Sequence, residues 1–255
     1  GLQFFKYPLY IFWRCWFYGW VLFTIIPIFP VLLIVTSSDK FYAAFFKIAK
    51  AWGKTLLFVM GFKLDVQEDE ALDDTKSYMF CPNHGSLMDP FILIASSKNP
   101  IVFVGKKEFV KIPIFGFFYR RVVIMVDRSS PKSRKRVYEM AKKRLQKGTS
   151  IAIFPEGLVP TEEVVLAPFK NGAFSLAIEH EIPIVPQVYY DCKRFFSWDI
   201  YKGSPGLFRV KQHPFIETKG LGTEDVESLK ETLFSLIEND LLADKKYMKD
   251  TNRNI

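Results

Sequence analysis

The chain has 255 residues, a length that suits one large α/β domain with an appendage. Hydrophobic residues make up 49% of it and charged residues 24%, which is enough apolar material for a core and excludes a disordered or collagen-like chain. Aromatic residues reach 16%, with 26 Phe and 5 Trp. Since a water-soluble core buries only a limited number of rings, we expect some of them to face lipid or a lipid substrate.

The chain carries 35 Lys and Arg against 27 Asp and Glu, a net charge of +8, and the excess is local. Residues 106–147 contain 14 Lys and Arg but only 3 Asp and Glu. Such a patch favours an anionic partner: phosphate, nucleic acid or acidic lipid. Cys15, Cys81 and Cys192 are too far apart for a disulfide framework or a metal motif, which indicates a reducing compartment. With only 3 His in the chain, we expect no zinc site.

The amino-terminal segment is apolar. Residues 15–35 contain no charged residue, a stretch long enough to span a bilayer as a helix. Pro27 and Pro30 lie inside it, so we expect a helix over about residues 8–26 that breaks before a second segment and turns back. A single membrane span is the alternative. A secretory signal fits less well, because Arg14 interrupts its start and no cleavage site follows.

Residues 39–60 have the pattern of a basic amphipathic helix. Four lysines fall within an arc of about 80° at helical spacing. The lysines are Lys40, Lys47, Lys50 and Lys54, and the opposite side carries Phe41, Phe45, Ala49, Trp52, Leu56 and Val59. This pattern predicts a helix in a membrane interface, with a surface helix packed on the protein's own core as the alternative.

We therefore interpret residues 1–62 as a membrane-anchoring helix pair and residues 63–255 as an α/β domain. Both flanks of the apolar segment are basic, so the positive-inside rule does not decide its orientation. We expect the protein to bind the phospholipid surface of the cell membrane at its cytoplasmic face, in one leaflet only.

After residue 61 short apolar runs alternate with polar helical patterns. The strand candidates are residues 63–66, 77–81, 101–105, 122–126, 150–154, 184–190 and 207–213. The helix candidates are residues 90–95, 109–112, 130–146, 172–179 and 223–243. This alternation predicts an α/β fold with a largely parallel or mixed sheet flanked by helices. Neither the G-x-G-x-x-G nor the G-x-x-x-x-G-K-[ST] nucleotide fingerprint occurs.

His84 and Asp89 are the first candidates for chemistry. His84 follows a predicted strand and precedes a predicted helix, and open α/β sheets bind ligands at the carboxyl ends of their strands. A bend between the two residues would bring Asp89 against the imidazole, to hold its tautomer and leave the other nitrogen as a base. The sequence has no G-x-S-x-G elbow, so we expect the substrate to supply the hydroxyl that a serine supplies elsewhere. The alternative is a loop histidine beside a helix-capping aspartate.

Four ordered blocks carry a family resemblance. Residues 83–86 (Asn-His-Gly-Ser) with Asp89 resemble the H-x-x-x-x-D motif of the glycerolipid acyltransferases, and the likeness is greatest to bacterial 1-acylglycerol-3-phosphate acyltransferases. The segments at residues 106–128, 154–157 (Phe-Pro-Glu-Gly) and 182–186 (Ile-Pro-Ile-Val-Pro) resemble the family's second, third and fourth motifs. The resemblance covers about residues 78–186, and an amphipathic amino-terminal extension is usual in the family.

The resemblance implies roles for particular residues. It makes His84 the general base, Asp89 the residue that orients it, and Gly85 a source of N–H groups for the oxyanion. The residues implied in acceptor binding are Lys106, Arg128, Glu156, Gly157 and Lys170. One departure concerns the third motif, which in the family commonly reads F-P-E-G-T-R-S, whereas here Gly157 is followed by Leu-Val-Pro-Thr. If the missing arginine holds phosphate, another of these cations must replace it.

The resemblance implies transfer of a fatty acyl group from acyl-CoA or acyl carrier protein to the sn-2 hydroxyl of lysophosphatidic acid, giving phosphatidic acid. No metal or cofactor is expected. The alternatives within enzymes are glycerol 3-phosphate or another lysophospholipid as acceptor. A non-catalytic lipid-binding membrane protein would also explain the helix pair and the basic patch. A nucleic-acid binder lacks a recognised groove-reading motif, so nucleic acid is not an expected partner.

Overall fold

The structure, a computed structural model, describes residues 6–113, 115–127 and 129–250. Its strands are β1 (Phe62–Glu68), β2 (Met79–Pro82), β3 (Ile101–Lys106), β4 (Val123–Val126), β5 (Ser150–Ala152), β6 (Ile184–Tyr189) and β7 (Gly206–Gln212). Its α-helices are α1 (Lys6–Val35), α2 (Tyr42–Val59), α3 (Asp89–Ser96), α4 (Phe115–Val122), α5 (Pro131–Leu145), α6 (Gly172–Glu179), α7 (Cys192–Phe195), α8 (Val226–Ala243) and α9 (Lys245–Asp250). Short 3₁₀ helices are η1 (Asp39–Phe41), η2 (Lys107–Lys111) and η3 (Thr223–Asp225).

The seven strands form one mixed sheet in the order β1-β7-β6-β2-β5-β3-β4. Neighbouring strands from β6 to β4 pair in parallel, β6 and β7 pair antiparallel, and β1 is parallel to β7. Each predicted strand is present, with ends that differ by at most two residues. The predicted mixed α/β fold is therefore confirmed.

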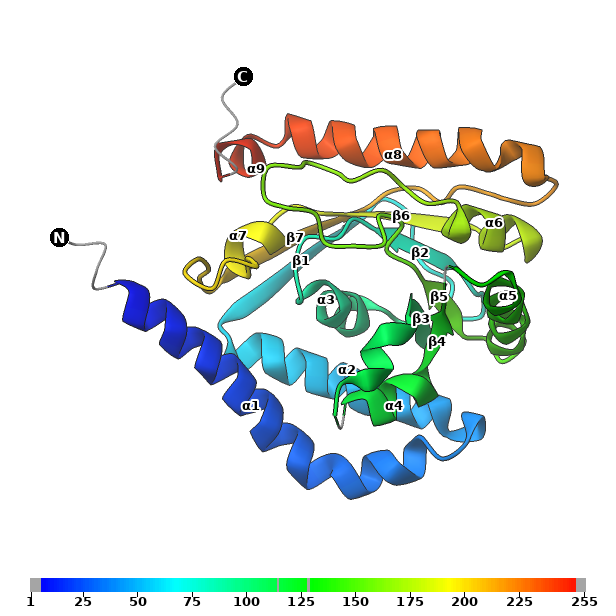
Figure 1. Ribbon diagram of the computed structural model, residues 1–255. Helices are drawn as coiled ribbons and strands as arrows, with labels where there is room; N and C mark the ends of the chain where they lie inside the picture. The colour runs from blue at the N-terminus through cyan, green and yellow to red at the C-terminus, as the bar shows by residue number, and fades with distance from the viewer. Residues whose placement is uncertain (1–5, 114, 128, 251–255) are drawn as a thin grey trace.

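Helices cover both faces of the sheet, with α5, α6 and α8 on one face and α2 and α3 on the other (Figure 1). Strand β2 shows why two apolar layers form. Met79 and Cys81 pack among residues of α5, α6 and α8, whereas Phe80 points to the opposite face and packs on Phe46 and Leu93. Side chains alternate between the faces of a strand, so a strand buried on both faces is apolar throughout, as β2 is.

Helix α1 differs from its prediction, because it continues through Pro27 and Pro30 instead of breaking before them. Each proline removes one backbone donor and crowds the preceding turn, and a helix can absorb this by bending. Figure 1 shows α1 changing direction along its length before the chain turns into α2. Ring contact between Phe29 and Phe118 of α4, at 5.4 Å between centroids, packs the second half of α1 on the protein. Among the described residues, α1 is the one helix that by length and composition is able to cross a membrane.

Helix α2 also corrects an interpretation. Its apolar face packs on the protein's own core: Phe46 and Leu57 are buried with residues of the sheet and α3, and Leu56 is also buried. The Tyr42 hydroxyl donates a hydrogen bond of 2.6 Å to the Ile101 carbonyl, which fixes the start of α2 to β3. The alternative of a core-packed surface helix therefore describes α2 better than a helix in a membrane interface. The helices before β1 share the core of the α/β part, and the division at residue 62 stays a prediction.

Helices α4, α7 and α9 were not predicted, and each is short. Helix α4 begins at Phe115, and its apolar residues Phe115, Phe118, Tyr119 and Val122 do follow a helical period, with Arg120 and Arg121 on the other side. The sequence therefore carried a signal for this short helix that the prediction did not use. The other predicted helices are present as α3, η2, α5, α6 and, for residues 223–243, η3 together with α8.

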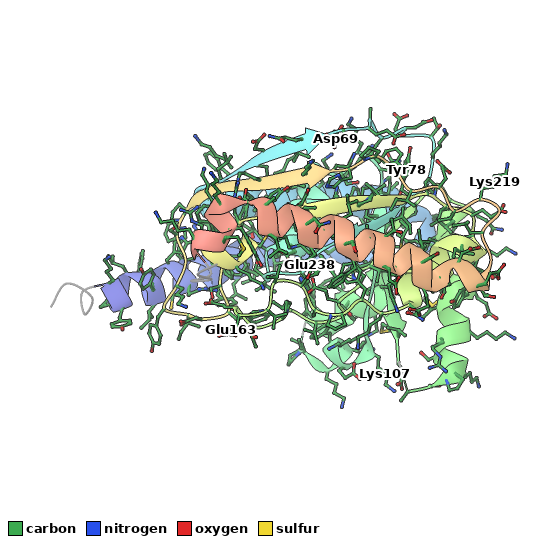
Figure 2. All side chains as sticks on the ribbon, turned by 90° about the horizontal axis from the view of Figure 1, so that it is seen from above. Asp69, Tyr78, Lys107, Glu163, Lys219 and Glu238 are labelled. Atoms are coloured by element: carbon green, nitrogen blue, oxygen red, sulfur yellow. The ribbon has the colours of Figure 1, made fainter. Side chains whose placement is uncertain are left out.

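Strands β6, β2, β5, β3 and β4 run in one direction, so their carboxyl ends share one edge of the sheet. Tyr78, just before β2, and Glu163, in the loop after β5, lie on opposite sides of the molecule in Figure 2. The first and third sequence motifs follow these carboxyl ends and the second begins at the end of β3, whereas the fourth motif, residues 182–186, lies at the start of β6. We call the rim formed by these carboxyl ends the carboxyl edge.

Candidate active site

The carboxyl edge brings the first and third motifs together. Strand β2 ends at Pro82, so Asn83 and His84 follow at once, and the adjacent strand β5 leads into Phe154 and Glu156. The Asn83 amide closes the opposite side of the site: its Nδ2 donates to the Tyr189 carbonyl at 3.1 Å, and its Oδ1 accepts the Tyr189 N–H at 2.7 Å. This pair fixes the loop after β2 to the end of β6, where the fourth motif leads.

The predicted contact between His84 and Asp89 is confirmed. His84 Nδ1 lies 2.6 Å from Asp89 Oδ2. Asp89 is fully buried, whereas the His84 side chain keeps 18% of its surface exposed. A histidine in this setting has one nitrogen committed to the protein and one available for substrate.

Backbone N–H groups hold the Asp89 carboxylate beside His84. Its Oδ2 also accepts the N–H groups of Gly85 at 2.6 Å and Ser86 at 3.0 Å. These donors favour the ionised carboxylate, which must then accept a hydrogen from His84 Nδ1. The imidazole is thereby held with its proton on Nδ1 and its lone pair on Nε2, the arrangement that a general base requires.

Gly85, which the family resemblance implies as an oxyanion donor, has its N–H engaged in the structure, and the oxyanion role stays a prediction. Its N–H is engaged by Asp89, so an oxyanion would have to compete with that carboxylate for it. A Cβ at residue 85 would lie 3.2 Å from Cys192 Cβ and 3.3 Å from Lys193 Cγ. The glycine therefore lets α7 approach the Asp89 loop closely.

Glu156 is almost fully buried, with 1% of its surface exposed. Its Oε1 accepts the backbone N–H of His84 at 2.7 Å and its Oε2 accepts that of Ala167 at 2.8 Å. Burial raises the pKa of Glu156 to about 7, although the two N–H donors and the nearby charges of Lys193 and His84 act in the opposite direction. Glu156 thus joins the loop after β5 to the backbone of His84, and acceptor binding by its carboxylate stays a prediction.

Phe154 supports the His84 ring from one side. It stacks on His84 with 4.1 Å between centroids and 17° between planes. The roles of Phe154, Asn83 and Tyr189 were missed from the sequence. Asn83 and Phe154 each belong to a motif, beside His84 and Glu156 respectively, and this position was the signal that could have found them. Nothing in the sequence pairs Asn83 with Tyr189.

The remaining predicted residues lie along the same rim or its loops. Lys106 ends β3, two strands from β2, with β5 between them. Gly157 has φ 70°, in the left-handed region, and turns the chain after Glu156. The Lys170 N–H donates to the Pro155 carbonyl at 2.9 Å, and its side chain is exposed. Arg128 lies outside the described residues.

Two of the hollows on the described surface bear on the position of the site. One of about 270 Å³ reaches Gly85 and is lined by residues 159–162 together with Lys193, Ser197 and Trp198. A larger one of about 390 Å³ is lined by residues that include Ser77 and Pro183, which precede β2 and β6. The larger hollow therefore lies at the opposite ends of the strands from His84. Among the residues that the structure describes, no group of three or more His, Cys, Asp or Glu is placed to hold a metal ion.

Comparison with known proteins decides the family. The model of the acyltransferase family matches residues 63–190, half of the chain. The chain belongs to the acyltransferase family. It is 28% identical over 205 residues to the 1-acyl-sn-glycerol-3-phosphate acyltransferase of Borreliella burgdorferi, covering 80% of each chain. It is 25% identical over 249 residues to the human alpha enzyme of the same name, covering 94% of this chain and 86% of that one. The match to the coconut enzyme of that name, at 27% identity, covers 79% of this chain but 65% of the relative.

A solved structure matches the acyltransferase fold along the chain. It is the crystal structure of the 1-acyl-sn-glycerophosphate acyltransferase PlsC from Thermotoga maritima, with a TM-score of 0.71 and 18% sequence identity. The match covers 94% of this chain and 96% of that one. At this identity the comparison supports the fold alone.

Proposed function

We propose that this acyltransferase is membrane-bound and moves a fatty acyl group from a thioester to the sn-2 hydroxyl of lysophosphatidic acid. The observation that carries the mechanism is the 2.6 Å contact between His84 Nδ1 and a buried Asp89 that also accepts two backbone N–H groups. The acceptor is taken from the names of the relatives, which are 1-acyl-sn-glycerol-3-phosphate acyltransferases. The donor is acyl-CoA or acyl carrier protein, and the transfer uses neither metal nor cofactor.

The proposed step is direct transfer. His84 Nε2 takes the proton of the acceptor hydroxyl while its oxygen forms a bond to the thioester carbonyl carbon. The carbon–sulfur bond then breaks, and the proton passes from His84 to the departing thiolate. Asp89 stabilises the imidazolium that exists between these two events, because its ionised carboxylate faces Nδ1–H. A general base of this kind contributes on the order of 10²–10⁴ in rate.

The acceptor phosphate needs cations beside this histidine. Lys106 ends β3 on the same edge of the sheet, and a lysine there acts as a point charge for phosphate. Arg128 and Lys170 are proposed as additional cations that take the place of the family's third-motif arginine. The membrane location is supported by α1, whose apolar outer side chains are exposed.

The test is thiol release from a long-chain acyl thioester by the detergent-solubilised full chain, with the lipid product identified by mass. Lysophosphatidic acid, glycerol 3-phosphate and a second lysophospholipid are compared as acceptors, for the wild type and for His84→Ala. Release that depends on lysophosphatidic acid and falls at least about 100-fold in the variant supports the proposal. If thiol is released only with one of the other two acceptors, that acceptor replaces lysophosphatidic acid in the proposal. No release from folded wild-type protein with either donor favours a lipid-binding protein.

A further inference from the structure

A second apolar surface lies beside α1. The hairpin formed by η2 and α4 exposes three large apolar side chains: Phe109 is 45%, Ile112 46% and Phe115 51% exposed. Lys107, Lys111 and Arg120, which are also exposed, flank them. Apolar side chains bordered by cations are typical of a segment that lies in a membrane interface.

The hairpin is a fixed element and not a loose loop. A Cβ at Gly116 would lie 1.9 Å from the Val110 carbonyl oxygen, so η2 and α4 close against each other at this glycine. A Cβ at Gly105 would lie 2.0 Å from the Tyr119 hydroxyl, so α4 is also packed tightly on β3. The exposed rings are therefore held outward by a rigid support.

The hairpin surface is continuous with α1. Phe29 of α1 and Phe118 of α4 are in ring contact, and the outer side of α1 nearby exposes Ile26 at 66% and Ile34 at 62%. Figure 1 shows α4 next to the second half of α1. A lipid surface that covers one of these faces thus reaches the other.

A third segment flanks the opposite half of α1. Trp198 is 62% exposed and Ile200 is 51% exposed in the loop after α7. Tyr201 in the same loop is in edge contact with Tyr7, at 5.1 Å between centroids. Because η2 follows β3 and this loop follows β6 by way of α7, both apolar segments extend from the carboxyl edge. Both segments therefore lie on the side of the molecule to which the carboxyl edge belongs.

We propose that the η2–α4 hairpin is a second bilayer-contact element, which binds an anionic lipid surface together with α1. The hairpin begins directly after Lys106, so its contact with lipid brings this cation to the level of the headgroups. A lysolipid would then present its phosphate to the carboxyl edge without leaving the bilayer surface. This inference rests on the membrane association proposed above, but not on the acyl transfer.

The test uses one fluorophore at a time on the full chain. Cys15→Ser removes the exposed cysteine, and Cys81 and Cys192 are buried. An environment-sensitive label is placed at Ile112→Cys or, as a matched control, at Leu242→Cys on α8, where the native side chain is 41% exposed. Protein is reconstituted with vesicles of phosphatidylcholine and phosphatidylglycerol, and quenching by aqueous iodide is measured.

We expect the label at residue 112 to shift to shorter wavelength and to become several-fold less quenched on vesicles, while the label at residue 242 stays accessible. Vesicles of phosphatidylcholine alone should give a smaller effect, because they offer no anionic headgroup to Lys111 and Arg120. Lys107 contributes less, since it is already paired with Asp127 at 2.7 Å. Equal quenching at both positions in vesicle-bound protein would overturn the proposal, as would failure of the full chain to bind vesicles. Thiol release is measured separately, so shielding of residue 112 without acyl transfer would count against the proposed function alone.

Discussion

The carboxyl edge and the apolar surface of α1 are held in place by different forces. At the edge, the buried carboxylates of Asp89 and Glu156 accept directional hydrogen bonds from the backbone and from His84. Along α1, only Arg14, Phe17 and Leu32 are buried, and most of the remaining surface is apolar and exposed. Hydrogen bonds to buried charges depend steeply on geometry, whereas apolar burial depends mainly on area. Isosteric changes should therefore damage the edge much more than the helix.

The largest effect is expected from Asp89→Asn, which keeps the shape of the side chain. An amide that turns its oxygen to the Gly85 and Ser86 N–H groups loses the charge facing His84, and one that turns its NH₂ to His84 stabilises the wrong tautomer. We expect kcat to fall on the order of 10⁴-fold with little change in KM, by analogy with buried aspartates in catalytic triads. Steady-state kinetics on protein with an unchanged thermal transition would measure this.

A matched change on α1 sharpens that prediction. Phe12→Leu alters a side chain that is 63% exposed and keeps the surface apolar, so activity should stay within about twofold. If Asp89→Asn lowered kcat as little as Phe12→Leu, the contact between Asp89 and His84 would not be needed for turnover.

Glu156 tests how much a buried carboxylate that accepts only backbone N–H groups contributes to stability. Glu156→Ala leaves the His84 and Ala167 N–H groups without their acceptor, so the free energy of unfolding should fall by about 2–5 kcal/mol. Glu156→Gln retains one acceptor and should lose less than half as much. Denaturant unfolding of the two variants in detergent measures the difference. Equal losses would show that the acceptor and the volume that Gln retains contribute nothing, and would contradict this account of the two hydrogen bonds.

The fold was more predictable than the site because its signals are local. Buried strands such as β2 and β6 are short apolar runs between polar segments, so their positions follow from the sequence. The continuity of α1 through Pro27 and Pro30 depends on tertiary contacts such as that between Phe29 and Phe118, which the local pattern does not contain.

In the site, the spacing of His84 and Asp89 and their family resemblance were enough to predict their contact. The contact between Glu156 and the backbone of His84 joins residues 72 positions apart, and the use of Gly85 in binding Asp89 depends on the backbone direction of one peptide. Sequence motifs place these residues at one edge but do not tell which N–H each carboxylate accepts. Directional contacts between distant loops are therefore what the structure adds.

The pH dependence of stability should carry the signature of Glu156. Its folded-state pKa is raised to about 7 from an ordinary value near 4.5, so the folded protein holds this proton more tightly than the unfolded chain. The stabilisation is complete below about pH 4.5 and is lost as the pH rises through about 7. Relative to Glu156→Gln, the wild type should lose up to about 3 kcal/mol across this interval. Unfolding measured at several pH values checks the slope, and a difference that stays constant with pH would contradict the assignment.

The smallest effect is expected where α1 makes its few directional contacts. The Arg14 guanidinium donates to the carbonyls of Ser197 and Lys202 and lies 4.0 Å from the Phe196 ring centre. Arg14→Met keeps most of the apolar volume but removes these donors, so we expect a loss of about 1–2 kcal/mol in unfolding free energy. Lys54→Met, at an exposed position of α2, serves as control and should change it by less than about 0.5 kcal/mol. Because the carbonyls belong to the loop after α7, Arg14→Met should also speed proteolysis within residues 196–203. Unchanged proteolysis together with unchanged stability would mean that apolar packing alone holds α1. Directional hydrogen bonds would then matter at the carboxyl edge and not along α1.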